Sequence, residues 1–346
     1  MPINSHTIAI AGASGAVGRE VLGILERRGH PPEKIRALGS FRSTGSTISY
    51  GDASLKISEL TPEAFDGCQV AIFATPSETS RRFVPEASRR GLIVVDNSSA
   101  FRQDPSVPLV VPEVNPEALG SAGNASRVAA NPNCSTILLV VATSPLRRAF
   151  GIDRLDVATY QAVSGAGAAA IDELLHHTRE ALHERSAEPQ KFHEPCAFNV
   201  FSHDSAVDVA SGLNVEEQKM IRETRRIWND ESVAICPTCV RVPVVRAHVE
   251  AVTITLARPA READVRQALA TAPGLIVIDE RAENRFPTSR KATGQHDVLV
   301  GRIRPDPSET PTDGAYRRYS LLLAGDQLLK GAAWNAVQLA DLIASR

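Results

Sequence analysis

The chain has 346 residues, more than one ordinary hydrophobic core accommodates, so we expect two domains. Its apolar content of 43%, charged content of 23% and formal net charge of -2 are typical of a soluble globular protein and exclude a general attraction to nucleic acid or to an anionic membrane. No apolar run reaches the roughly 18 residues of a membrane span, and the N-terminus shows no export signal. Five cysteines, few and odd in number, favour the reducing cytoplasm over a disulfide framework.

Short apolar segments alternate with helical patterns through the first 130 or so residues. Residues 7–12 form the first strand candidate, and a helical pattern runs from Gly18 to about Arg28. Further buried-strand candidates lie at residues 34–40, 69–75, 92–98 and 107–113. Residues 77–91, between two of these strands, show a helical pattern. Alternating strands and helices predict an N-terminal Rossmann-like parallel sheet, so the fold class is α/β.

The pattern changes after residue 133. A helix at about 134–149 is followed by a strand, a Gly/Ser turn and a second helix within residues 154–182. Apolar and polar residues then alternate at 249–259, 297–306 and 316–326. This alternation predicts an α+β domain with a mixed, largely antiparallel sheet that has one face covered.

The domain boundaries follow from this change of pattern. We expect a first domain over residues 1–132 and a second over 133–326. Residues 328–345 read as one amphipathic helix, and we expect residues 327–346 to pack back on the first domain.

Three glycines separate the first predicted strand from its helix. Gly12, Gly15 and Gly18 have the spacing G-x-x-G-x-x-G, which differs from the usual G-x-G-x-x-G. A plain turn is the alternative, but a strand before and a helix after favour a dinucleotide site, where backbone approaches a diphosphate at a helix N-terminus. The cofactor-binding residues expected here are Gly12, Ser14, Gly15, Ala16 and Val17.

The residues after the second predicted strand favour NADP over NAD. An NAD enzyme usually places Asp or Glu there to hold the ribose 2′-hydroxyl, but residues 39–46, GSFRSTGS, contain no acid. A cation and hydroxyls suit a 2′-phosphate, although a solvated loop arginine is the alternative. The residues concerned are Ser40, Arg42, Ser43 and Thr44.

A lone cysteine stands at the start of the helix predicted from residue 134. Pro132 discourages helix before it, and Asn133 is a natural N-cap. A thiol at a helix N-terminus has a lowered pKa, so Cys134 is a candidate nucleophile, with a packed core thiol as the alternative.

Other cysteines and histidines give weaker signals. Cys236 and Cys239 form a CxxC, but no second pair or Cys/His group accompanies them, so we predict no metal site. His176, His177 and His183 lie on a predicted helix among polar residues, and we expect them to face solvent.

Eleven short motifs occur in one order along the chain. They are GASGAVG, SFRSTG, DNSSAFR, VPEVN, NPNCST, YQAVSGAG, AFNVFSHD, VEEQKM, CVRVPVVRAH, VGRIR and LLKGAAWNAVQLA. With them the chain resembles the bacterial aspartate-semialdehyde dehydrogenases over essentially its whole length. The resemblance implies NADPH-dependent reductive dephosphorylation of β-aspartyl phosphate to L-aspartate semialdehyde, in lysine, methionine and threonine biosynthesis. It also implies a homodimer or a dimer of dimers.

The resemblance assigns roles to individual residues. Cys134 matches the nucleophile that forms a thioester, His248 the acid/base group and Gln161 the amide that orients the acyl intermediate. The residues that match its substrate ligands are Arg102, Asn133 and Lys219 for phosphate, Arg241 for the α-carboxylate and Glu216 for the ammonium group. Those that match its nicotinamide side are Ser164, Gly165 and Gln327.

The helix around VEEQKM shows how two interpretations compete. Asn214 and Glu217 form an N-x-x-E capping arrangement, so Glu217 has a structural explanation. Glu216 and Lys219 lie three residues apart on one face and could be a solvated surface pair. The resemblance favours the interpretation that they are substrate ligands.

The chain departs from the family pattern near the acid/base histidine. The family usually has Gly-His-Ser-Glu or Gly-His-Thr-Glu, whereas this chain has Ala247 before His248 and Val249 after it. These neighbours are expected to make the surroundings of His248 drier and to lower its pKa. Gln327 stands where asparagine is usual, and residues 74–80 replace a more glycine-rich cofactor loop.

Two alternatives stay open. N-acetyl-glutamyl-phosphate reductase performs the same chemistry, but its acylated substrate has no ammonium group for Glu216 to bind. A catalytically silent relative that serves in binding or assembly should have lost Cys134 or His248, and both are present.

Overall fold

A computed structural model describes residues 2–121 and 127–346. The chain forms two compact units, which are described separately here: unit 1 is Met1–Asn133 with Gly331–Arg346, and unit 2 is Cys134–Lys330. Within the described part of the chain, no helix has both the length and the apolar character needed to cross a membrane.

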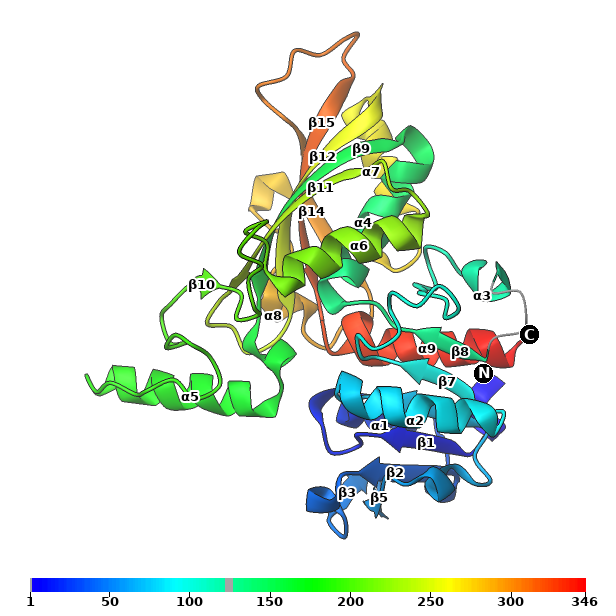
Figure 1. Cartoon of the computed structure of the whole chain (residues 1–346). Helices are drawn as coiled ribbons and strands as arrows, with labels where there is room; N and C mark the ends of the chain where they lie inside the picture. The colour runs from blue at the N-terminus through cyan, green and yellow to red at the C-terminus, as the bar shows by residue number, and fades with distance from the viewer. Residues whose placement is uncertain (1, 122–126) are drawn as a thin grey trace. The chain divides into compact units, whose positions relative to one another are not determined.

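Unit 1 is built on a six-stranded parallel sheet (Figure 1). Its strands are β1 (Ile8–Ala11), β2 (Ile35–Gly39), β5 (Ser58–Glu59), β6 (Val70–Phe73), β7 (Ile93–Asp96) and β8 (Val128–Ala130), and a separate hairpin is formed by β3 (Thr47–Tyr50) and β4 (Ala53–Lys56). The spatial order is β5-β2-β1-β6-β7-β8, the doubly wound order in which the winding reverses between β1 and β6. Ligands of such sheets bind at the carboxyl ends of the strands that flank this reversal, so the topology confirms the predicted fold and marks a site.

The longer helices of unit 1 pack against its sheet. They are α1 (Ala16–Arg27), α2 (Ser77–Arg89), α3 (Ala118–Ser121) and α9 (Trp334–Ala344). In α1 the buried Val21, Leu22 and Leu25 recur at helical spacing. The C-terminal α9 contacts β6, β7 and α1, and its Asp341 carboxylate forms a 2.7 Å ion pair with Arg28.

The strand predicted at residues 107–113 is wrong. That segment makes only an isolated bridge, from Leu109 to Ala130, and the edge strand of the sheet is instead β8. Pro108 and Pro112 explain the difference, because proline has no N–H to donate to a ladder. The three-residue β8 was too short to be predicted.

Unit 2 contains a seven-stranded mixed sheet. Its strands are β9 (Ile152–Gln161), β10 (Phe201–Ser202), β11 (Ala234–Arg241), β12 (His248–Ala260), β13 (Leu275–Val277), β14 (Val298–Pro305) and β15 (Tyr316–Gly325), in the order β10-β11-β9-β12-β15-β14-β13. The β12–β15, β12–β9 and β14–β15 pairs are antiparallel, whereas β11–β9 and β13–β14 are parallel. The mixed, largely antiparallel sheet that the sequence predicted is therefore present.

Helices cover one face of this sheet. The helices of unit 2 are α4 (Cys134–Phe150), α5 (Ala168–Leu182), α6 (Val215–Trp228), α7 (Glu262–Ala270) and α8 (Ser289–Ala292). Among them α4, α6 and α7 contact the strands of that face, and the short α8 contacts β15 through a separate cluster that includes Ala292 and Ala324 (Figure 1). Alternate residues of β9 and β12 are buried on that side, while the residues between them are partly or fully exposed. The expected alternation with one covered face is thus confirmed.

The C-terminal helix differs from the single helix predicted at 328–345. A π-helical turn, Leu329–Ala333, precedes α9. Asp326 accepts hydrogen bonds from the N–H groups of Leu328 and Leu329 and holds the start of this turn.

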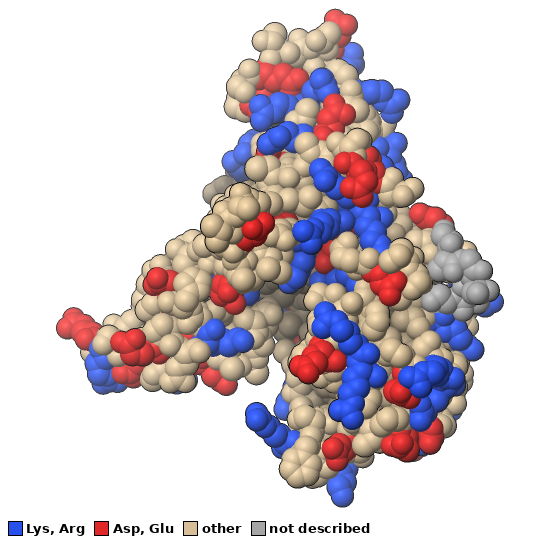
Figure 2. Space-filling model, viewed as in Figure 1, with Lys and Arg blue, Asp and Glu red and all other residues tan. Residues whose placement is uncertain are grey.

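The surface charge is mixed. On the face shown in Figure 2, basic and acidic side chains are interspersed, so that face has no large area of positive charge that would attract a polyanion.

Candidate active site

The glycine turn of unit 1 lies at the reversal point of its sheet. Gly12 follows β1 with φ +83°, and a Cβ placed there would lie 2.3 Å from the carbonyl oxygen of Ala74, which follows β6. A Cβ on Gly18 would lie 2.2 Å from the carbonyl oxygen of Gly12. Only glycine fits either position, and Gly15 then serves as the N-cap of α1. The first-turn N–H groups of α1 have no partner within the helix and suit a diphosphate, so the turn fits a dinucleotide.

The loop after β2 presents a cation. Arg42 lies exposed in a short 3₁₀ turn, Phe41–Ser43, and the loop carries no acid. The hydroxyl groups of Ser43 and Thr44 both donate to the carbonyl oxygen of Ser40, at 3.0 and 3.2 Å. In this conformation the Arg42 guanidinium is therefore the main side-chain donor left for a phosphate.

In unit 2 the thiol of Cys134 faces an imidazole. Cys134 is the first residue of α4 and is partly exposed, and its Sγ lies 3.7 Å from Nε2 of His248 on β12. His248 is fully buried. A Cβ on Gly165 would lie 3.3 Å from His248 Cε1, so the glycine lets the turn after β9 approach the ring.

The backbone sets the tautomer of His248. The N–H of Ala162 donates to Nδ1 at 3.0 Å, so Nδ1 bears a lone pair and the proton of the neutral ring lies on Nε2. Burial, and next the positive charge of Arg241, lower the pKa of His248 to about 3. The lowered pKa has the direction expected from the apolar neighbours of His248 in the sequence. With a pKa of about 3, the ring is neutral at any pH near 7.

A charged network surrounds Gln161 at the end of β9. Its Nε2 donates to Ser135 Oγ at 2.9 Å and to Glu216 Oε1 at 3.4 Å, while Arg241 Nη1 donates to its Oε1 at 3.5 Å. Lys219 Nζ donates to the other oxygen of Glu216 at 3.1 Å. Glu216 is 4% exposed, so this is not the solvated surface pair of the alternative interpretation.

Arg241 is held by groups that the sequence did not point to. Its Nε pairs with Asp204 at 2.6 Å, and its Nη1 donates to the carbonyl oxygen of Ala162 at 3.2 Å. Burial alone would raise the pKa of Asp204, but the Arg241 guanidinium outweighs it and holds that pKa below its ordinary value. His203 is also buried. Burial, and next the positive charge of Arg241, lower its pKa to about 4. The motif AFNVFSHD contains both residues but gives no indication of their partners.

The capping box of α6 is confirmed. Asn214 accepts from the N–H of Glu217 at 2.9 Å, and the Glu217 carboxylate accepts from the N–H of Asn214 at 2.9 Å. Glu217 also accepts from the N–H of Cys239. The cap fixes the first turn of α6, from which Glu216 and Lys219 project.

Two proposed phosphate ligands belong to unit 1. Arg102 is 8% exposed and donates to the carbonyl oxygens of Asn131 and Asn97, at 2.9 and 2.7 Å. Asn133 is buried and is the last residue of this unit.

Glu250 was not singled out from the sequence. It lies two residues after His248 on the buried side of β12, and within the described residues neither of its carboxylate oxygens has a hydrogen-bond partner. Burial, and next the charge of Glu216, raise its pKa well above the ordinary value. Its surroundings therefore favour the neutral form of this acid.

Ala247 has an uncommon backbone conformation for alanine, with φ +71°. The left-handed region costs a non-glycine residue roughly 1–2 kcal/mol. Its methyl group is buried in an apolar cluster with Ala292, Leu299 and Ala324, and burying one carbon contributes about 0.8 kcal/mol. Packing thus offsets much of the strain where the family usually has glycine.

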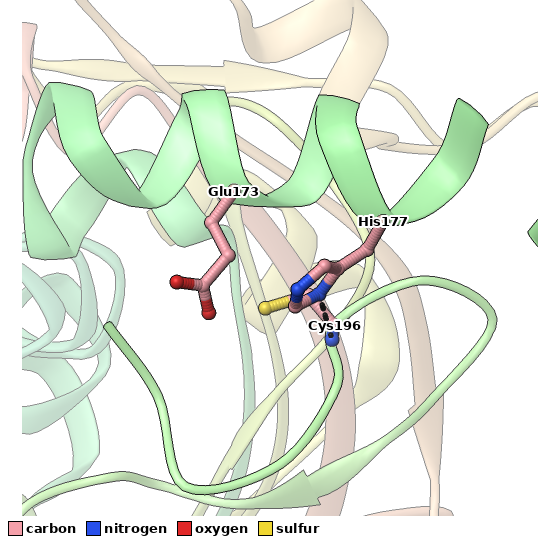
Figure 3. A group of neighbouring side chains, drawn as sticks. All are labelled: Glu173, His177 and Cys196. Carbon is pink, nitrogen blue, oxygen red and sulfur yellow. Dashed lines mark hydrogen bonds between the residues drawn. The ribbon is translucent and has the colours of Figure 1, made fainter. Parts of the chain in front are cut away.

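One group of potential metal ligands occurs in the described part of the chain (Figure 3). Glu173 and His177 lie on one face of α5, and with Cys196 their ligand atoms lie within 4.8 Å of one another. Each is buried, so the expectation that His177 faces solvent is wrong. Its i, i+4 spacing with Glu173 places both under the segment that follows α5.

Two of these side chains, those of Glu173 and His177, already have protein partners. The Glu173 carboxylate accepts from the N–H groups of Gln190, Lys191 and Phe192, and His177 Nδ1 accepts from the N–H of Cys196 at 3.2 Å. Burial, and next the charge of Glu173, raise the pKa of the Cys196 thiol to about 12, whereas a metal ligand must be a thiolate. We interpret the group as structural, because its hydrogen bonds hold residues 188–196 against α5.

Comparisons with known proteins agree over nearly the whole chain. Residues 7–122 match the family described as semialdehyde dehydrogenase, NAD binding domain, and residues 143–330 match semialdehyde dehydrogenase, dimerisation domain. Aspartate-semialdehyde dehydrogenase of Synechocystis sp. is 45% identical over 98% of this chain and 97% of its own, and that of Bacillus subtilis is 40% identical over 96% of each. A crystal structure of aspartate semialdehyde dehydrogenase II from Vibrio cholerae, complexed with ASA, superposes with a TM-score of 0.91 at 39% identity, over 98% of each chain.

Proposed function

This chain belongs to the aspartate-semialdehyde dehydrogenase family, and on that premise we propose that it catalyses NADPH-dependent reductive dephosphorylation of β-aspartyl phosphate to L-aspartate semialdehyde. It is an oxidoreductase of amino-acid biosynthesis with an NAD(P)-binding Rossmann domain. Its proposed place is the branch toward lysine, methionine and threonine. Its five free cysteines fit a reducing cytoplasm.

The observation that carries the proposal is the pairing of Cys134 with His248 beside charges suited to an amino acid. Sγ and Nε2 are 3.7 Å apart, and Gln161 links the thiol's helix to Glu216 and Arg241. Glu216 suits an ammonium group, and the planar guanidinium of Arg241 suits the α-carboxylate. Lys219 supplies a donor for the phosphate, and the family resemblance assigns the same role to Arg102 and Asn133.

The chemistry begins at the sulfur. The Cys134 thiolate attacks the β-carbonyl carbon, the bond to the phosphate oxygen breaks, and its electron pair leaves with the phosphate, so that a thioester remains on Cys134. When bound, the nicotinamide cofactor supplies a hydride to the thioester carbon. The thiohemiacetal anion on Cys134 then collapses, the carbon–sulfur bond breaks, and its electron pair returns to sulfur as the aldehyde leaves.

His248 serves these steps as a donor. Its Nε2–H points toward Sγ, so it stabilises the thiolate and the oxyanions that form next to it. Its side chain does not accept the thiol proton in this tautomer, because Nδ1 is occupied by the Ala162 N–H. The role expected from the sequence, a base that takes the proton of Cys134, is therefore replaced in the proposal by that of a hydrogen-bond donor.

The test is a phosphate-dependent assay in the oxidative direction. Reduction of NADP with L-aspartate semialdehyde and phosphate is compared with reduction using N-acetyl-L-glutamate semialdehyde. We expect a preference of at least about 10²-fold for aspartate semialdehyde, since a neutral acylated amine offers the Glu216 carboxylate no positive charge. Equal rates, or a preference for the acetylated substrate, would contradict the proposal.

Cofactor choice gives a separate prediction at Arg42. Arg42→Ala should raise KM for NADP by about tenfold or more, because a charge-assisted hydrogen bond contributes roughly 1.5–3 kcal/mol, and only NADP carries the 2′-phosphate. KM for NAD should change less than about twofold. Arg36→Ala, which removes an exposed arginine on β2, is the control for lost surface charge. Equal effects of Arg42→Ala on both cofactors would show that Arg42 is not the selector.

The uncovered face of the unit 2 sheet supports a homodimer. It presents Ala158, Ala251 and Leu322 between buried neighbours, and Tyr160 is 41% exposed. The part of the chain described as the dimerisation domain of the family includes this face. Wild-type protein should sediment as a dimer, and Ala251→Arg should shift it toward monomer by placing an unpaired charge in the interface. A wild-type monomer, or a variant that still dimerises, would contradict this assignment.

A further inference from the structure

The residues before His248 are tied to the turn that carries Ser164. The N–H groups of Val163 and Ser164 donate to the carbonyl oxygens of Val244 and Val245, at 2.9 and 3.1 Å. One residue earlier, the N–H of Ala162 donates to the His248 ring. The short helix Val163–Ala166 and the loop 242–247 therefore form one structural unit beside the ring.

The side-chain amide of Gln327 connects the two segments, and its two hydrogen bonds are called the Gln327 bracket here. Its Oε1 accepts from the N–H of Ala247 at 2.9 Å, and its Nε2 donates to Ser164 Oγ. Gln327 is 2% exposed, so both bonds are shielded from water. The same amide thus holds the residue before His248 and the turn that presents Ser164.

The base of this bracket is itself fixed. The preceding Asp326 is fully buried and pairs with Arg246 Nε at 2.7 Å, while its carboxylate also accepts from the N–H of Gly294. Gly325 is the partner of His248 in the β12–β15 ladder. The Gln327 side chain therefore starts from a rigid point beside the strand that carries the histidine.

We propose that Gln327 is a positioning residue for His248, which it sets by holding Ala247 in the left-handed conformation. Ala247 resists this conformation, as any residue with a Cβ does, and the bond to its N–H opposes its relaxation. Relaxation would turn the start of β12 and move Nε2 away from Sγ. The inference rests on the proposed function of Cys134 and His248. It is compatible with the cofactor contact expected of Gln327, because the second N–H of the Gln327 amide takes no part in the bonds to Ala247 and Ser164.

The test couples Gln327 to Ala247. Gln327→Asn has the same amide on a chain one methylene shorter, which does not reach both partners. Glycine takes positive φ freely, so Ala247→Gly should remove the need for the bracket. The four proteins to compare are the wild type, Gln327→Asn, Ala247→Gly and the double variant. Gln69→Asn is the matched control, since Gln69 likewise bridges two backbone groups, the N–H of Thr7 and the carbonyl of Gly67.

Two readouts are measured, one of them independent of turnover. The first is the rate at which iodoacetamide alkylates Cys134 in the protein without cofactor, followed by peptide mass spectrometry and normalised to a cysteine-free peptide of the same digest. The second is kcat with KM for NADP.

We expect Gln327→Asn to slow alkylation of Cys134 by about threefold or more and to lower kcat by about tenfold, with KM for NADP within about twofold. In the Ala247→Gly background the same change should cost less than about threefold in kcat. Gln69→Asn should match the wild type.

A change confined to KM for NADP would overturn the inference, as would equal losses in both backgrounds. If Gln327→Asn does not fold by circular dichroism, Ser164→Ala removes one anchor of the bracket and should give the same pattern at smaller size. A wild type that turns over no aspartate semialdehyde would contradict the proposed function, while the alkylation rates would still decide the positioning role.

Discussion

Cys134→Ser should lower turnover by more than about 10³-fold, which corresponds to roughly 4 kcal/mol in the barrier. A serine hydroxyl is far less acidic than a thiol and is a weak nucleophile here, because the neutral His248 presents its Nε2–H and not a free lone pair to this position. The measurement is kcat in both directions of the reaction. NADP binding and thermal unfolding should be unchanged, since the substitution replaces one atom at a partly exposed position.

The covalent step is visible separately. Wild-type protein mixed with acyl phosphate in the absence of NADPH should gain the mass of the acyl group on the peptide that contains Cys134, and Cys134→Ser should not. Cys236→Ser, which changes an exposed cysteine on β11, is the matched control and should keep full rate. A Cys134→Ser protein that retains more than about a tenth of the wild-type rate would show that the nucleophile lies elsewhere.

His248→Ala should lower kcat by about 10²-fold or more, the usual cost of removing one hydrogen-bond donor that stabilises negative charge in the transition state. The loss follows from removal of the Nε2–H that faces Sγ at 3.7 Å. His248→Asn should also lose rate while it retains binding of aspartate semialdehyde, because the substrate charges are met by Arg241 and Glu216. His176→Ala, on the exposed side of α5, is the control.

The pH dependence follows from the lowered pKa of His248. The ring is neutral above a pH of about 3 in the folded enzyme, so its protonation should produce no fall in kcat between pH 8 and 5. In the unfolded chain the same ring takes up a proton near its ordinary pKa of about 6.5. The unfolded state therefore binds more protons between these values, and His248 makes the protein less stable as pH falls from about 6.5 toward 3.

Thermal unfolding as a function of pH checks this sign. The wild type should lose more stability between pH 7 and pH 5 than His248→Asn does, because the variant has no ring to protonate on unfolding. An acidic limb of kcat near pH 6.5 that disappears in both His248 variants would instead show that the ring titrates at its ordinary value during turnover.

Local patterns in the sequence determined much of the fold and part of the site. The spacing Gly12-x-x-Gly15-x-x-Gly18 between a strand and a helix predicts the turn at the sheet reversal, because only glycine tolerates the backbone contacts of the first and third positions. The capping box of Asn214 and Glu217 predicts the start of α6, because both bonds form within four residues. Alternation along residues 249–259 predicts a strand with one covered face.

Only the tertiary structure decided which groups meet across long separations. Arg241 pairs with Asp204, and the ring of His248 receives the N–H of Ala162, although 37 and 86 residues separate these partners. No short-range pattern encodes either contact, yet the second one determines the tautomer of His248 and so its role beside Cys134. The burial of His177 and the left-handed Ala247 were likewise decided by packing, since the segment that covers α5 and the bracket formed by Gln327 come from distant parts of the chain.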